Sequence, residues 1–163
     1  MKLTYNQMSD VFGGLNSLDA HLNSLIANKE RRPLLKDTEV NGLFCIIAKN
    51  LRHLKTKLEG LNEDKENIRL KLSEQDPSGK PMQFKTTVKD EAGNSQEVFQ
   101  AKITDPTNAQ IFAAQMQVFY KAEHEIDIHA IDYDKIKKLE VSGSTLALLM
   151  DTVIAMPGEK KEE

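Results

Sequence analysis

Apolar side chains recur at helical spacing along much of the chain and are interrupted by short turn-forming segments. Between residues 8 and 25 they return at gaps of three and four, which predicts a helix with one narrow apolar stripe. Thr4 and Gln7 precede this stripe with the spacing of a capping box. Gly13 and Gly14 lie inside the helix, so we expect either a bend or the close approach of another backbone there.

A second stripe runs from Val40 to Leu72 and predicts a helix of about 50 Å. Pro33 separates it from the first helix, so we expect the two to form an antiparallel αα-hairpin. The first helix is too short to cover the distal half of the second. An apolar stripe cannot stay bare in water, so a later segment or another chain must cover it.

The next segments predict a β-hairpin followed by a third helix. Proline and glycine at 76–81 end the long helix, and strands are expected near Gln83–Lys89 and Gln96–Ala101. Asp105 and Pro106 form a cap and first-turn pair that starts a helix ending near Tyr120. This helix can return along the exposed part of the second helix.

The C-terminal region predicts a short strand and a final helix. Residues 124–131 alternate polar and apolar side chains, as in a half-buried strand, and "DYDKIKKL" predicts a short helix or turn. A last helix is expected from a cap at Ser142 or Ser144 to Pro157. The fold class is therefore α+β and mainly α, with a long αα-hairpin and a β-hairpin tip. We expect one domain over 1–157, a protruding arm over 58–104, and a disordered charged tail over 158–163.

The composition of the chain excludes several classes of function but does not identify one. The 163 residues carry a formal net charge of -3, which gives no broad basic surface for nucleic acid. No stretch reads as a signal peptide or a membrane span. The single cysteine, Cys45, cannot form an intrachain disulfide, and its apolar neighbours predict a buried core residue in a reducing cytoplasm.

Motifs for catalysis are absent from the sequence. It contains no phosphate-binding loop, nucleophile elbow, H-E-x-x-H pair or cysteine pair, so we expect neither an enzyme nor a cofactor. His124, Asp127 and His129 lie close in sequence, but two-residue spacing on a strand separates side chains by about 7 Å. A metal site would need a third ligand from elsewhere, so we predict a solvated polar face and no metal. His21 and His53 are expected to be partly buried structural histidines that could face each other across the αα-hairpin.

Basic residues cluster at 29–32 and at 49–57, and the second segment could contact phosphates. Arg52 and Lys55 could hold phosphates, but pairing of the lysines with acids such as Glu59 four residues away is the simpler interpretation. Weak nucleic-acid binding therefore remains a third hypothesis.

The order of segments resembles small uncharacterised proteins of tailed phages. The resemblance is carried by a "KL…RNLK"-like helix, a charged insert and an ending rich in spaced isoleucine and leucine. The matching residues are Leu51, Arg52, Leu54, Lys55, Ile128, Ile131, Leu139, Val141, Ser142 and Leu146. It implies a phage origin, in the host cytoplasm during infection or in the virion, and by association an accessory or structural role.

The leading hypothesis is a non-catalytic phage protein that acts by protein–protein association, most simply as a neck or tail assembly component. Its partner would be a copy of itself, another phage protein or a host protein. The alternative is a phage-encoded inhibitor that binds a host defence protein. The residues predicted to contact the partner are Leu58, Leu61, Ile68, Leu72, Phe84, Val98 and Phe99.

Overall fold

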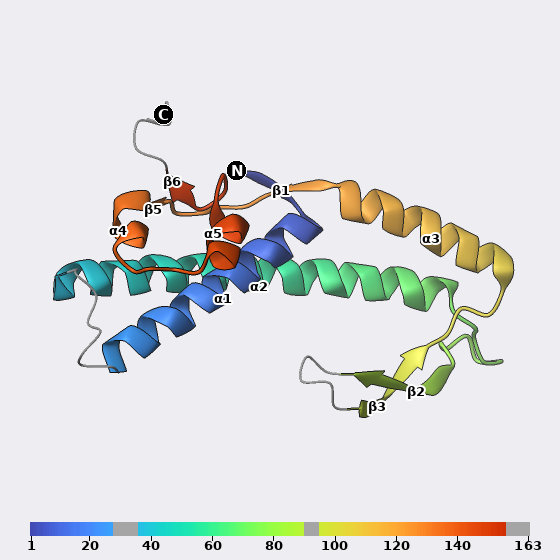
Figure 1. The fold of residues 1–163 in the computed structure, drawn as a ribbon. Helices are drawn as coiled ribbons and strands as arrows, with labels where there is room; N and C mark the ends of the chain where they lie inside the picture. Colours follow the sequence, from blue (N-terminus) through green and yellow to red (C-terminus); the bar gives the residue numbers. More distant parts are fainter. Residues whose placement is uncertain (28–35, 90–94, 156–163) are drawn as a thin grey trace. The chain divides into compact units, whose positions relative to one another are not determined.

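The computed structural model describes residues 1–27, 36–89 and 95–155. It is mainly helical with small sheets, which confirms the α+β, mainly α class. The helices are α1 (Tyr5–Ala27), α2 (Asp37–Leu72), α3 (Pro106–Lys121), α4 (Tyr133–Lys137) and α5 (Gly143–Leu149) (Figure 1). The predicted turn around Pro33, the hairpin turn and the charged tail lie outside the described residues.

The strands in this described part form pairs. Antiparallel pairs join β1 (Lys2–Thr4) to β4 (Glu123–Glu125) and β2 (Gln83–Lys89) to β3 (Ser95–Ala101). A parallel pair joins β5 (Ile131–Asp132) to β6 (Ile154–Ala155). By internal contacts the chain divides into two compact units. Unit 1 comprises Met1–Glu59 and Glu123–Glu163, and unit 2 comprises Gly60–Ala122.

Helix α1 organises the core of unit 1. It begins with the predicted capping box: the Thr4 N–H donates to Gln7 Oε1 at 2.9 Å, and the Gln7 N–H donates to Thr4 Oγ1 at 3.3 Å. Its stripe is buried at Met8, Val11, Leu15, Leu18 and Leu22. The αα-hairpin prediction gave α1 the second helix as its partner, but α1 makes its most extensive helix contact with α5, beside which it lies in Figure 1.

Helix α5 closely approaches α1 at Gly14. A Cβ atom at Gly14 would lie 2.9 Å from Leu149 Cδ2 and 3.0 Å from Leu148 Cβ. A Cβ at the neighbouring Gly13 would meet nothing within 4 Å. The close approach of α5 therefore explains Gly14, although the nearest atoms belong to side chains and not to the backbone that was expected.

The first part of α2 completes the core of unit 1 with the buried side chains of Val40, Leu43, Ile47 and Leu54. Cys45, however, is exposed, so its predicted burial is wrong. On a 3.6-residue helix the positions 43 and 47 share a face, whereas position 45 lies about 200° away from position 43. The helix therefore has a solvent-exposed face at Cys45, although the residues around Cys45 are mostly apolar in sequence.

The C-terminal region contains less regular structure than its sequence predicts. The strand β4 ends at Glu125, and residues 126–130 have no regular secondary structure, although Ile126 is buried. Helix α5 has the predicted Ser142 cap but ends at Leu149, because the chain turns extended at Met150 and takes a positive φ of 65° at Asp151. The expected helix to Pro157 is therefore wrong in length, and Val153 and Ile154 are buried beyond its end.

Unit 2 contains the end of α2, the β2–β3 hairpin and α3. The strands match the predicted ones to within one residue. Asp76 holds the turn after α2 by accepting hydrogen bonds from the Ser78 hydroxyl at 2.6 Å and the Lys80 N–H at 3.0 Å. These bonds, the Ser78 hydroxyl first, lower the pKa of the Asp76 carboxyl. Helix α3 begins as predicted, with Asp105 accepting from the Asn108 N–H.

Candidate functional site

The predicted contact residues on α2 are only partly covered. Leu61 is buried, whereas Leu58, Ile68 and Leu72 are half-buried. The stripe is therefore neither bare nor fully sheltered. Cover by a later segment was one of the two possibilities expected for the distal half, and α3 provides part of that cover.

Helix α3 meets the distal part of α2 through specific contacts within unit 2. The Arg69 guanidinium lies 6.0 Å from the centroid of the Phe112 ring, within the range of a cation–π contact. Asn108 Nδ2 donates to the carbonyl of Leu72 at 3.2 Å. Met116 on α3 is buried. The third helix thus returns along the second one, as its amphipathic pattern allowed.

An open apolar groove remains beside this contact. It has a volume of about 520 Å³ and is lined by Ile68, Ala114, Gln115, Val118 and Phe119. Val118 is 71% exposed, and Ile111 on the same helix is 40% exposed. Exposed apolar residues that adjoin a groove are typical of binding surfaces. We call these five lining residues the α3 groove.

The hairpin divides its three predicted contact residues between two faces. Phe84 and Val98 lie on one face of the β2–β3 ribbon and are half-buried, and Lys102 lies 5.7 Å from the Phe84 ring. Phe99 lies on the other face, opposite Lys85, and is 66% exposed. Phe99 thus faces away from the side of the ribbon that Phe84 and Val98 share. Of the predicted α2 residues, only Ile68 lines the α3 groove, and sequence reasoning missed Val118 as an exposed position.

The basic segment of α2 has the simpler arrangement that its spacing suggested. Arg52 is exposed, and Lys55 pairs with Glu59 at 3.9 Å across one helical turn. Both partners of this ion pair are well solvated, so it contributes little to stability. No cluster of cations for gripping phosphates is evident at these positions.

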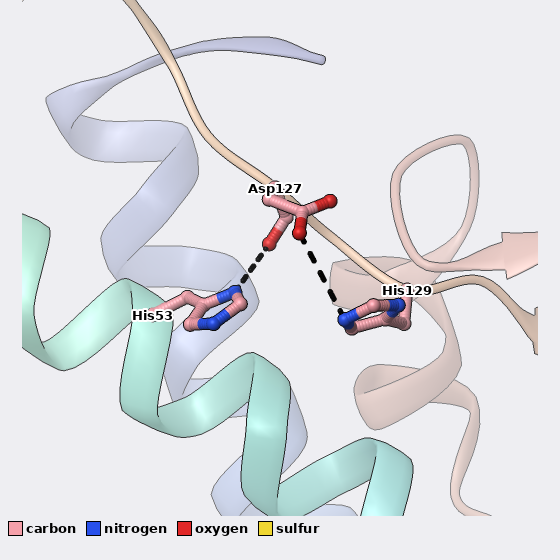
Figure 2. A group of neighbouring side chains, drawn as sticks. All are labelled: His53, Asp127 and His129. Carbon is pink, nitrogen blue, oxygen red and sulfur yellow. Dashed lines mark hydrogen bonds and ion pairs between the residues drawn. The ribbon is translucent and has the colours of Figure 1, made fainter.

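Two segments that are distant in sequence bring three side chains together in unit 1. Figure 2 shows His53 of α2 facing Asp127 and His129, which lie on the irregular segment after β4. The potential ligand atoms of the three side chains all lie within 4.8 Å of one another. The separation of His129 Nε2 from Asp127 Oδ2 is 3.9 Å, well below the value of about 7 Å expected for neighbours on one strand face. The cause is that residues 126–130 are not a strand.

The other two histidines lie apart from this cluster. His21 Nε2 lies 2.7 Å from the carbonyl of Leu139, an acceptor, so His21 ties α1 to the segment after α4. His124 pairs in register with Leu3, and its Nε2 is buried with no hydrogen-bond partner among the described residues. The sequence grouped His124 with Asp127 and His129, but His53 is the histidine that joins them. His21 and His53 are both half-buried, as expected for structural histidines, and each ring is bonded to a different backbone carbonyl.

No protein-family model, curated protein or solved structure matches this chain. Among the helices of the described ranges, none is both long enough and apolar enough to cross a lipid bilayer.

Proposed function

We propose that this protein is a non-catalytic phage component that works by protein–protein association through the α3 groove. The supporting observation is the open apolar groove, where Val118 is 71% exposed although α3 covers part of the distal α2 stripe. A side chain kept in water at such a position would gain about 1.5–3 kcal/mol on full burial. The residues predicted on the hairpin, above all Phe99, would extend the contact.

The role in phage assembly is part of this proposal and derives from the sequence resemblance. A neck or tail component would use the groove to bind a copy of itself or a neighbouring virion protein. An inhibitor of a host defence protein would use the same kind of surface. These two roles differ in the partner that the groove selects, so identification of the partner separates them.

The test uses two charge variants on one helix. Val118→Glu places a charge in the groove, whereas Ala113→Glu places the same charge at an exposed α3 position outside the set of lining residues. Self-association is measured by analytical ultracentrifugation, and partners are identified after affinity purification from infected cells. We expect Val118→Glu to weaken association at least tenfold and Ala113→Glu to leave it unchanged, because only the first buries a charge.

The outcomes distinguish the roles as well as test the groove. Copurification of virion proteins with the unmodified chain supports assembly, and capture of a host defence protein supports the inhibitor role. Equal association by the two variants contradicts the groove as the contact. A chain that remains monomeric and captures no protein from infected cells contradicts the proposed function itself.

A further inference from the structure

We infer that His53, Asp127 and His129 form a binding site for a divalent transition-metal ion of the Zn²⁺ class. This inference is separate from the α3 groove, because all three residues belong to unit 1. Two imidazoles and one carboxylate are ligands that Zn²⁺ prefers, and three protein ligands leave a fourth position open to water or a further ligand. Cu²⁺, Ni²⁺ and Co²⁺ suit the same nitrogen and oxygen donors.

The spacing of the three side chains is close to what such an ion needs. Zn–N and Zn–O bonds of about 2.0–2.1 Å place the ligand atoms of a tetrahedral site roughly 3.4 Å apart. The separation of 3.9 Å between His129 Nε2 and Asp127 Oδ2 is near this value, and a ring nitrogen of His53 completes a set of ligand atoms that all lie within 4.8 Å of one another. The Asp127 side chain is 76% exposed. It can therefore rotate toward an ion without disturbing the core.

The backbone that carries two of the ligands is held in place by buried hydrogen bonds. Asn50 on α2 is fully buried, and its side chain bonds both backbone groups of His129. Its Nδ2 donates to the carbonyl at 2.8 Å, and its Oδ1 accepts from the N–H at 2.8 Å. Asn50 and His53 are three residues apart on one helix, so they lie on the same side of α2. This arrangement fixes His129 near His53 before any ion arrives and lowers the ordering cost of binding.

A hydrogen bond from His53 sets the proton of its ring. His53 Nδ1 lies 2.9 Å from the carbonyl oxygen of Asp127 (Figure 2). A carbonyl can only accept, so Nδ1 carries the proton and the lone pair of the neutral ring is on Nε2. Metal-binding histidines characteristically donate their other ring N–H to a carbonyl or carboxylate in this way. The contact thus has the form of an outer-shell bond of a metal site.

Zinc titration of the full chain, first freed of metal with a chelator, tests this inference. Affinity is measured by competition with a chromophoric zinc chelator. Ring resonances of the four histidines are followed by two-dimensional ¹H–¹⁵N NMR. We expect saturation at one Zn²⁺ per chain, with shifts at His53 and His129 but not at His21 and His124. The last two rings serve as internal controls, because they lie outside the cluster.

Two matched variants separate the site from general binding to surface acids. Asp127→Asn removes one ligand, whereas Glu125→Gln removes the same charge from an exposed side chain two residues away. Loss of an outer-shell partner alone usually lowers metal affinity 10–100-fold, so we expect Asp127→Asn to weaken zinc binding at least tenfold. Glu125→Gln should retain the original affinity. Circular dichroism of both variants checks that the fold is intact.

Three results would overturn the inference. The first is the absence of saturable zinc binding at one equivalent. The second is an equal response of all four histidine rings, which would indicate adventitious binding. The third is equal affinity of the two variants, which would exclude the Asp127 carboxylate as a ligand.

Discussion

Replacement of Gly14 by alanine tests the packing of α1 against α5, and the adjacent Gly13 provides a matched control. Both glycines lie inside α1, where alanine is favoured over glycine by about 1 kcal/mol. Gly13→Ala adds a methyl group that meets nothing within 4 Å. We therefore expect Gly13→Ala to raise the free energy of unfolding by about 0.5–1 kcal/mol.

At Gly14 the same gain in helix propensity is opposed by a steric clash. The new methyl carbon would lie 2.9 Å from Leu149 Cδ2 and 3.0 Å from Leu148 Cβ. Leu149 is fully buried, and the Cβ of Leu148 is fixed by its own backbone, so α5 must shift to relieve the contact. Overpacking of this kind costs about 1–3 kcal/mol. After the propensity gain, Gly14→Ala should be destabilised by up to about 2 kcal/mol.

Thermal and urea unfolding of the two variants measure the difference directly. For a chain of this size, each kcal/mol shifts Tm by about 2–4 °C, so Gly14→Ala should melt several degrees below Gly13→Ala. A Leu149→Ala background removes the contact with the Leu149 side chain but keeps the one with Leu148 Cβ, so Gly14→Ala should lose part of its penalty there. Equal melting temperatures for the two glycine variants, or a higher one for Gly14→Ala, would refute the close approach of α5.

Three further predictions concern single polar groups. Asn50→Ala should lower the free energy of unfolding by about 2–4 kcal/mol in urea titrations, because it leaves both backbone groups of His129 without their partner. Asn41 is exposed, so the control Asn41→Ala should change the free energy of unfolding by less than about 0.5 kcal/mol. Because the pKa of Asp76 is lowered, the hydrogen bonds of its turn stabilise the fold at neutral pH, and this contribution is lost as the pH falls through the folded-state pKa. Ser78→Ala should raise the pKa of Asp76 toward its ordinary value in a ¹³C-carboxyl NMR titration. An unchanged pKa would contradict the Ser78 hydroxyl as the cause of the shift. His124→Leu should leave the stability unchanged or raise it by up to about 1 kcal/mol, since it removes a buried nitrogen without a partner, and a clear loss in Tm would show that His124 is needed for packing.

Much of the fold could be predicted from local sequence, because helix starts and hairpin strands are determined by neighbouring residues. The capping box at Thr4, the Asp105–Pro106 helix start and both hairpin strands depend on residues within a few positions of one another. Periodicity alone also predicted that α3 would be amphipathic enough to lie along α2. These elements have nearly the predicted boundaries, since tertiary contacts reinforce rather than override the local preference.

The errors arise where a distant contact decides the structure. The apolar sequence after Ser142 is compatible with one long helix and equally with the observed short helix, turn and strand. The strand forms because Ile154 pairs with Ile131, which buries both side chains. Likewise, periodicity reveals that α1 has an apolar face but not that α5 packs on it. The adjacent Gly13 and Gly14 were a local sign of a close approach, but they did not identify the partner.

The histidine cluster illustrates why a site can escape a reading of sequence spacing. Asp127 and His129 were recognised, but on the assumed strand their side chains would lie about 7 Å apart and a third ligand would have to come from elsewhere. The spacing did not identify His53 as that ligand. What the spacing did not show is that Asn50 is buried and binds a distant segment. An uncharged amide within an apolar helical stripe must find hydrogen-bond partners, and here its partners are the backbone groups of His129. A buried amide one turn before a histidine on the same helix is therefore a signal that a distant, irregular segment docks beside that histidine and brings its own side chains to it.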